Sequence, residues 1–131
     1  MSELTDDARE FLDRKVFAHV ATLMPDGAPQ VSPVWIDHED SHVLFNTAEG
    51  RYKTENLEKD GRIAISIVDP DNPYRHMLIR GRVAELTREG ADDHADAMAK
   101  KYLDQDTYPF RQPGEVRVKV LIEPESLTIH G

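Results

Sequence analysis

Short apolar segments with a period of two, each closed by a turn signal, constrain the fold of this chain more than any other feature. Residues 116–122 carry valine or isoleucine at every second position, and residues 63–67 carry isoleucine in the same way. This alternation is typical of β-strands that bury one face. Turn-forming runs such as Pro25-Asp26-Gly27 separate the segments. Consecutive strands joined in this way form hairpins, so the pattern indicates an antiparallel barrel or sandwich and not alternating strand–helix units.

A chain of 131 residues is short enough for one domain, which we place at residues 1–131. The apolar patterns within it predict a mainly β fold of six or seven strands with about three short helices. The predicted strands cover residues 16–24, 29–36, 42–47, 63–68, 77–86, 116–122 and 127–130, and the predicted helices cover residues 4–15, 51–59 and 90–103.

Four local features interrupt these elements. Residues 37–41 are predicted to form a polar turn, and residues 69–73, with two prolines, a loop. Gly81 lies inside a strand pattern and predicts a bulge or a close backbone approach. Pro124 lacks the N–H that a strand ladder needs, so we expect it to interrupt the last strand.

The composition excludes several classes of function. There are 16 Lys+Arg against 25 Asp+Glu, a net charge of −9, and general nucleic-acid binding needs a basic surface instead. The absence of cysteine excludes disulfides, thiolate metal sites and a thiol nucleophile. No apolar run approaches the roughly 20 residues of a membrane span, and the acidic start lacks the apolar core of a signal peptide. We therefore expect a cytoplasmic protein that binds neither nucleic acid nor membranes.

A basic cluster at the start of the predicted helix 51–59 stands out in this acidic chain. Arg51 and Lys53 fall in the first turn, where free backbone N–H groups already make the environment positive. Basic residues are unfavourable there unless an anion lies between them, and helix N-termini bind phosphate. The alternative is that Glu49 and Glu55 neutralise a solvated basic turn, and the residues alone leave both interpretations open.

Side-chain catalysis finds no support in the sequence. The chain has no Gly-x-Ser-x-Gly elbow, no Walker phosphate loop and no Gly-x-Gly-x-x-Gly motif. Asp37, His38, Asp40 and His42 could be combined into a metal site, but a polar hairpin turn is where solvated residues are expected, so we predict no metal. No acid–base pair emerges, and we predict no catalytic side chain.

Pro33 lies inside an apolar strand pattern, which predicts an edge strand or a place where pairing is open. Ser32 and the open backbone could then contact the polar rim of a flat ligand. Trp35, the only tryptophan, is favoured as a core residue over a stacking partner. Arg75 is either a second anion contact or the partner of a surface carboxylate. The aromatic residues of the loop 108–114 either pin that loop or line a pocket.

Four stretches, taken together, resemble the flavin and deazaflavin oxidoreductases of the split β-barrel, pyridoxamine-oxidase-like superfamily. They cover most of the chain: HVATLMPDGAPQVSPVW from His19, NTAEGRYKTENLEKDGRIAISI from Asn46, DPDNPYRHMLIRGRV from Asp69 and VRVKVLIEP from Val116. The resemblance implies a six- to seven-stranded antiparallel split β-barrel with a few short helices. The sequence of these stretches is most similar to the branch that uses the 5-deazaflavin coenzyme F420. The helix start is shared in part with FMN-binding relatives, so FMN is the alternative cofactor.

The same resemblance implies a set of cofactor-binding residues. These match the phosphate-binding helix start, the segment that runs along the cofactor, the strand beside the tricyclic ring, and a loop that contacts the cofactor from the same or the partner subunit. In that order they are Arg51, Lys53 and Asn56; Asn46, Thr47, Ala48, Glu49 and Gly50; Val31, Ser32, Pro33 and Val34; and Tyr74 and Arg75.

The function implied by the resemblance is hydride transfer from reduced coenzyme F420 to a conjugated small-molecule acceptor. The implied assembly is a homodimer with the cofactor at the subunit interface. A cofactor that is itself the hydride donor explains why no catalytic dyad is found, because the protein then supplies position, electrostatics and exclusion of water. A protein that binds a flavin or deazaflavin without catalysis remains the alternative class.

Overall fold

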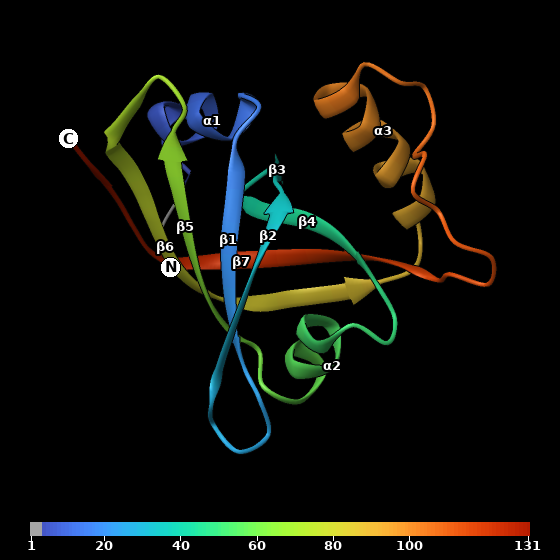
Figure 1. The fold of residues 1–131 in the computed structure, drawn as a ribbon. Coiled ribbons are helices and arrows are strands. Elements are labelled where there is room, and N and C mark those ends of the chain that lie inside the picture. The colour runs from blue at the N-terminus through green and yellow to red at the C-terminus, as the bar shows by residue number, and fades with distance from the viewer. Residues whose placement is uncertain (1–3) are drawn as a thin grey trace.

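The computed structural model describes residues 4–131, which form one seven-stranded sheet and three helices (Figure 1). In chain order the elements are α1 (Asp6–Asp13), β1 (Phe17–Leu23), β2 (Pro29–Trp35), β3 (Asp37–Glu39), β4 (His42–Ala48), α2 (Tyr52–Lys59), β5 (Arg62–Asp69), β6 (Asn72–Thr87), α3 (Ala91–Leu103) and β7 (Arg117–His130). The strand order is β2-β1-β5-β6-β7-β4-β3, and every neighbouring pair is antiparallel. The prediction of a mainly β, antiparallel split barrel with a few short helices is confirmed.

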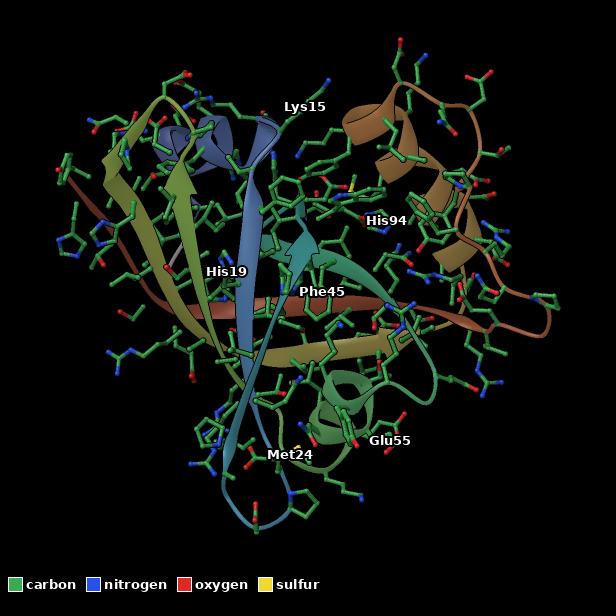
Figure 2. The ribbon with its side chains drawn as sticks, viewed as in Figure 1. Lys15, His19, Met24, Phe45, Glu55 and His94 are labelled. Carbon is green, nitrogen blue, oxygen red and sulfur yellow. The ribbon has the colours of Figure 1, made fainter. Side chains whose placement is uncertain are left out.

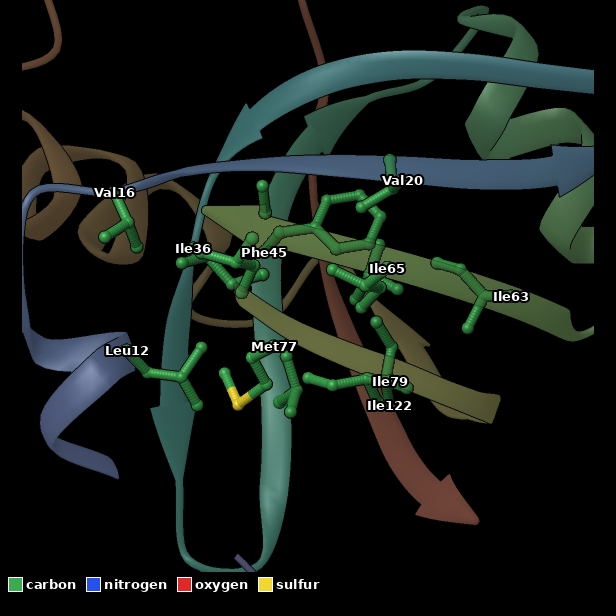
Figure 3. Close-up of a cluster of buried hydrophobic side chains, with 14 of the residues drawn as sticks. Leu12, Val16, Val20, Ile36, Phe45, Ile63, Ile65, Met77, Ile79 and Ile122 are labelled. Carbon is green, nitrogen blue, oxygen red and sulfur yellow. The ribbon is translucent and has the colours of Figure 1, made fainter. Parts of the chain in front are cut away.

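The sheet curls around an apolar core because its strands alternate as the sequence predicts. In β5 the side chains of Ile63, Ile65 and Ile67 are buried, and the residues between them face outward. Figure 3 shows Ile63 and Ile65 among side chains from β1, β4, β6 and β7, with Leu12 of α1 at one end, and Ile67 belongs to the same cluster. Thr5 caps α1 by accepting a hydrogen bond from the Ala8 amide at 3.1 Å. One continuous core therefore lies inside the curled sheet.

The two longest strands, β6 and β7, bend together at Gly81. Register shifts follow Arg80 and Val83, and Gly81 lies opposite Pro124. A side-chain Cβ at Gly81 would lie 2.4 Å from the Glu123 carbonyl oxygen, so the predicted close approach is confirmed. The expected interruption at Pro124 is wrong, because β7 continues through it. The register shift between Arg80 and Gly81 disrupts the ladder of backbone hydrogen bonds next to Pro124, so a proline without an N–H is tolerated there.

Two predicted loops are shorter than expected. Residues 37–41 were expected to form a turn, but Asp37–Glu39 pairs with β4 as β3, since the left-handed backbone of Asp40 (φ 56°) makes the turn tight. Residues 72 and 73 belong to β6, because Asp69 accepts a hydrogen bond from the Asp71 amide at 2.8 Å and closes a short turn. Pro73 lies at the start of β6, where the missing N–H of a proline removes no hydrogen bond from the ladder.

Helix α3 is tied beside the sheet by two polar side chains. Lys101 donates to the carbonyl oxygens of Leu12 and Ile36, at 2.5 and 2.9 Å. The Tyr102 hydroxyl donates to the Val16 carbonyl at 2.6 Å and accepts from the Ile36 amide at 3.0 Å. Figure 1 shows α3 standing at one side of the sheet, while α2 lies below β6 and β7, to the right of the lower part of β1 and β2. No helix within residues 4–131 is long and apolar enough to cross a lipid bilayer.

We expect Gly81→Ala to lower the free energy of unfolding by about 1–3 kcal/mol, because the new methyl group meets the backbone of β7. Chemical denaturation measures the change. Gly61→Ala is the matched control, since its Cβ would lie 3.7 Å from the nearest atom, and it should shift stability by less than about 1 kcal/mol. Equal effects of the two substitutions would contradict a backbone approach specific to Gly81.

Candidate functional site

A cavity of about 220 Å³ lies where β2, β4, the start of α2 and α3 come together. We call it the cationic pocket. It is lined by Phe17, Pro33, Val34, Trp35, Asn46, Arg51, Lys53, Ala95, Met98, Tyr108, Phe110 and Arg117. Three cationic side chains form one part of this lining, and aromatic and aliphatic side chains form the rest. Five of the residues predicted to bind a cofactor are among them.

Lys53 is the most unusual residue of the pocket. Its exposed fraction is 9%, and within residues 4–131 no carboxylate lies within ion-pair distance of its ammonium group. Burial lowers the pKa of Lys53 below its ordinary value, and the charges of Arg51 and Arg117 lower it further. A solvated basic turn would not have these properties, so that interpretation of the helix start is wrong for Lys53.

The two guanidinium groups of the pocket share a single carboxylate. Arg117 donates from Nη1 to Glu115 at 2.7 Å, and Arg51 lies 3.9 Å from the other oxygen of Glu115. Arg117 and Glu115 are almost fully buried, whereas about half of the Arg51 side chain is exposed. One carboxylate against three cations leaves uncompensated positive charge, which favours an anionic ligand.

The start of α2 adds backbone donors to these charges. Arg51 is the N-cap of α2 and makes no side-chain capping hydrogen bond. The first N–H groups of the helix therefore lack the acceptor that a serine or aspartate cap supplies. The Thr54 hydroxyl bonds back to the Ala48 carbonyl at 2.8 Å, which fixes the helix against the end of β4.

Aromatic side chains form the apolar wall of the pocket. Trp35 stacks on Tyr102, with ring centroids 5.0 Å apart and planes inclined by 7°. Tyr108 and Phe110 contact the tryptophan ring at an angle. The expectation of a core tryptophan is wrong, because Trp35 faces the outer side of β2 with Phe17 and lies only half-buried under α3 and its loop.

The loop after α3 is pinned and also lines the pocket. Arg111 forms ion pairs with Asp92 and Asp96, at 3.5 and 3.2 Å. The Tyr108 amide donates to the same Asp96 at 2.8 Å. Of the two alternatives for the aromatic residues, the structure supports the pocket wall, and the side chain that anchors the loop is Arg111.

The structure divides the predicted strand Val31–Val34 between two faces. Pro33 and Val34 line the cationic pocket, and β2 is an edge strand, as the proline predicts. The Ser32 hydroxyl is buried without a hydrogen-bond partner in residues 4–131. Val31 is 62% exposed and faces a different surface, described below.

The predicted segment between β4 and α2 is similarly divided. Asn46 lines the pocket, whereas Thr47 and Ala48 are buried beneath it. Glu49 forms an ion pair with Arg88 and so does not neutralise Lys53. Gly50 has a φ of +87°, a backbone conformation that favours glycine at this turn into α2.

Three further predicted residues, from outside these two segments, also lie away from the pocket lining of a single chain. The Asn56 amide donates to the Thr22 hydroxyl at 3.0 Å and fixes α2 to β1. Arg75 pairs with the buried carboxylate of Asp69 at 3.1 Å, which is the alternative to an anion contact. Tyr74 is 84% exposed. Their predicted cofactor contacts therefore stay predictions.

A second hollow surface lies on the outer face of the sheet. Two adjoining cavities of about 480 and 470 Å³ share Ala21, Ala64, Arg80 and Ser126, and we call them the outer groove. It is lined by small side chains together with Arg62, Arg80 and Arg82, and Val31 is part of the lining. Among residues 4–131 no group of three or more histidine and acidic side chains is arranged to hold a metal ion.

The sequence analysis missed Arg117 as a pocket residue. It is 5% exposed and lies at the start of β7, beside Asn46 of β4. The only signal was a charged residue at a position that the strand pattern assigns to solvent. Ala95 and Met98 of α3 also line the pocket, and their helical spacing agrees with the predicted helix 90–103 but cannot show which residues face this pocket.

The family model of pyridoxamine 5'-phosphate oxidase matches residues 4–129. A search of curated proteins finds no match. Among solved structures, an F420 reductase is 28% identical with a TM-score of 0.80, over 92% of this chain and 94% of that one. A conserved hypothetical protein from Mycobacterium tuberculosis is 22% identical (TM-score 0.75, 99% and 84% covered), and a FAD-binding protein from Mesorhizobium loti is 18% identical (TM-score 0.70, 98% and 95% covered). The last two support the fold.

We expect Lys53→Met to raise the free energy of unfolding of the ligand-free protein at neutral pH, because it keeps the apolar stem and removes a buried, unpaired charge. The advantage should shrink in alkaline solution. The pKa of Lys53 is lower in the folded state than in the unfolded state. Between these two pKa values the unfolded state therefore binds more protons, and the free energy of unfolding of the wild type rises with pH. Denaturation at neutral and alkaline pH measures the gap. A gap that is constant or widens would contradict this assignment.

Proposed function

Since the chain belongs to the pyridoxamine 5'-phosphate oxidase family, we propose that it is an oxidoreductase that uses reduced coenzyme F420 as hydride donor to a conjugated small-molecule acceptor. The observation that carries the proposal is the buried, unpaired Lys53 in a pocket of three cations at a helix start. The choice of cofactor rests on the likeness to an F420 reductase.

The residues of the cationic pocket fit a phosphate-bearing group. Lys53 and Arg51 would hold the phosphate together with the first N–H groups of α2, because a charge-assisted contact is stronger than a neutral one. The buried Ser32 hydroxyl, which lacks a partner, would offer a hydrogen bond to the polar rim of the ligand. Pro33 and Val34 would provide an apolar surface beside the ring system.

Hydride transfer from a bound cofactor does not require a catalytic acid or base among the side chains of the protein. A bound reduced deazaflavin supplies the hydride, and the protein contributes orientation and exclusion of water. The described lining contains no carboxylate and no imidazole. The aromatic wall of Trp35, Tyr108 and Phe110 would exclude water from one side of the site and favour a flat, conjugated acceptor.

We infer that two copies of the chain complete the site. The pocket of about 220 Å³ is smaller than the roughly 300–1,000 Å³ of most small-molecule sites. The outer groove offers small residues, Ala21, Ala64 and Ser126, next to the exposed apolar side chains of Val31 and Leu78. Exposed apolar side chains gathered in this way mark an interface, so we assign the groove, whose lining also includes Arg62, Arg80 and Arg82, to a second copy. Tyr74 and Arg75 would then contact the cofactor of the partner.

Two alternatives remain within the same site. FMN is the alternative cofactor, because the helix start offers the same phosphate contacts to either molecule. A protein that binds a flavin or deazaflavin without catalysis is favoured by one observation, the absence of a carboxylate or imidazole among the described lining residues.

Fluorescence titration of the purified protein with F420 and with FMN should show saturable binding of F420. Oxidation of reduced F420 should exceed the free-cofactor rate for at least one member of a panel of quinones, enones and tetrapyrroles. Binding of FMN without any binding of F420 would identify FMN, and not the deazaflavin, as the cofactor. Saturable F420 binding without turnover across the panel would leave the non-catalytic alternative standing.

The same titration identifies the phosphate contact. Lys53→Met should weaken F420 binding by roughly 10- to 150-fold, the loss expected for a hydrogen bond to a charged group. Lys59→Met, an exposed lysine in the last turn of α2, is the matched control and should bind as the wild type does. Wild-type affinity should also fall more steeply with salt than that of Lys53→Met. Equal affinities of Lys53→Met and wild type at low salt would refute the phosphate contact.

Light scattering should show a dimer that Ala64→Glu converts to a monomer with weaker cofactor binding, because the substitution places a charge in the outer groove. Ala84→Glu, at an exposed position of β6 outside the groove residues, should remain dimeric. A wild-type monomer that binds cofactor tightly would contradict the dimeric site.

A further inference from the structure

A chain of partly buried polar contacts runs from β3 through α3 to the cationic pocket. His94 of α3 lies 3.1 Å from Asp37 of β3 through Nε2, and 3.1 Å from the Asn46 amide nitrogen through Nδ1. Asn46 Oδ1 accepts from Arg117 Nε at 2.8 Å, and Arg117 pairs with Glu115. The His94 side chain is 9% exposed and projects from α3 toward β4 (Figure 2). The chain ends at two pocket residues, Asn46 and Arg117.

The chemistry of the neighbours fixes the direction of the Asn46 amide. Arg117 Nε can only donate, so the atom that faces it must be the amide oxygen. The Ala91 carbonyl can only accept, and it lies 2.8 Å from the other side-chain atom, which must be the nitrogen. Both contacts demand the same orientation. The amide nitrogen is therefore the donor to His94.

The fixed amide determines the tautomer of His94. Nδ1 must be the acceptor because it faces an N–H of Asn46, so the proton of the neutral ring is on Nε2 and is donated to Asp37. Burial alone would raise the pKa of Asp37, but hydrogen bonds from His94 and from the His38 amide hold it below its ordinary value. The carboxylate is thus ionised and accepts the Nε2 proton.

We propose that His94 is a positioning residue of the cationic pocket, which acts by holding the Asn46 amide and, through it, the Arg117 guanidinium. Arg117 uses Nε for Asn46 and Nη1 for Glu115, and Nη2 makes no hydrogen bond within residues 4–131. Arg117 lines a pocket whose uncompensated positive charge favours an anion, so this donor is free to bind one. Without the acceptor on His94 the amide nitrogen of Asn46 keeps only the Ala91 carbonyl, so the amide that accepts from Arg117 Nε is held less firmly. The inference rests on the proposed function for its ligand.

Two substitutions separate the two sides of the ring. Asparagine places an amide oxygen where Nδ1 lies, and glutamine, one bond longer, places an amide nitrogen where Nε2 lies. His94→Asn thus keeps the acceptor for Asn46, and His94→Gln keeps the donor to Asp37. We expect His94→Asn to bind F420 and FMN within about twofold of wild type, and His94→Gln to bind about 3- to 10-fold more weakly, the loss of one neutral hydrogen bond. A merely structural role predicts similar losses in both, in proportion to their loss of stability.

NMR of isotopically labelled wild-type protein provides a readout that needs no ligand. The imidazole nitrogen shifts at neutral pH should show His94 as the neutral Nε2–H tautomer. An Nδ1–H tautomer, an imidazolium, or weaker binding by His94→Asn than by His94→Gln would overturn the inference, as would equal affinities of the two variants. If the wild type binds neither F420 nor FMN, the proposed function fails, and the tautomer alone decides whether His94 holds the amide.

Discussion

The bend of β6 and β7 at Gly81 is the constraint on which the other features depend. These two strands are the ladder shared by both halves of the sheet, since β5 pairs with the first part of β6 and β4 with the first part of β7. The backbones approach so closely at the bend that only glycine fits beside the carbonyl oxygen of Glu123. The bend turns the β2-β1-β5 half toward the β4-β3 half. The core is enclosed by this curl, and the space between β2 and β4 becomes the cationic pocket.

Placing Arg51, Lys53 and Arg117 around this space has an energetic consequence. Each buried charge loses solvation, and the single carboxylate of Glu115 offsets only part of that cost. The arrangement is unfavourable in the empty protein and becomes favourable when an anion is bound. Arg62, Arg80 and Arg82 gather along the outer groove as well, but there Arg62 pairs with Asp60 and Arg82 with Glu125. Stability is therefore reduced at the place where binding energy is available.

Helix α3 connects the apolar and the polar parts of the site. Its C-terminal turn is fixed by Lys101 and Tyr102, and Tyr102 also supports the ring of Trp35. Its first turns carry His94 to Asn46 and place Met98 over the pocket. One rigid element thus sets both the aromatic wall and the amide beside Arg117. A shift of α3 would change both at once, which explains why its anchoring contacts reach three separate segments of the chain.

The sequence by itself determined the local features: the period of two predicted the strands, Pro33 an edge, and Gly81 a close approach, because each depends on neighbours along the chain. The cationic helix start was visible for the same reason. The tertiary structure decided the partners. Whether Lys53 is solvated or buried depends on β2 and α3, and the carboxylate beside Arg51 is Glu115, far along the chain. Such contacts follow from strand order and from the bend, which bring together residues whose separation in sequence carries no signal of their proximity.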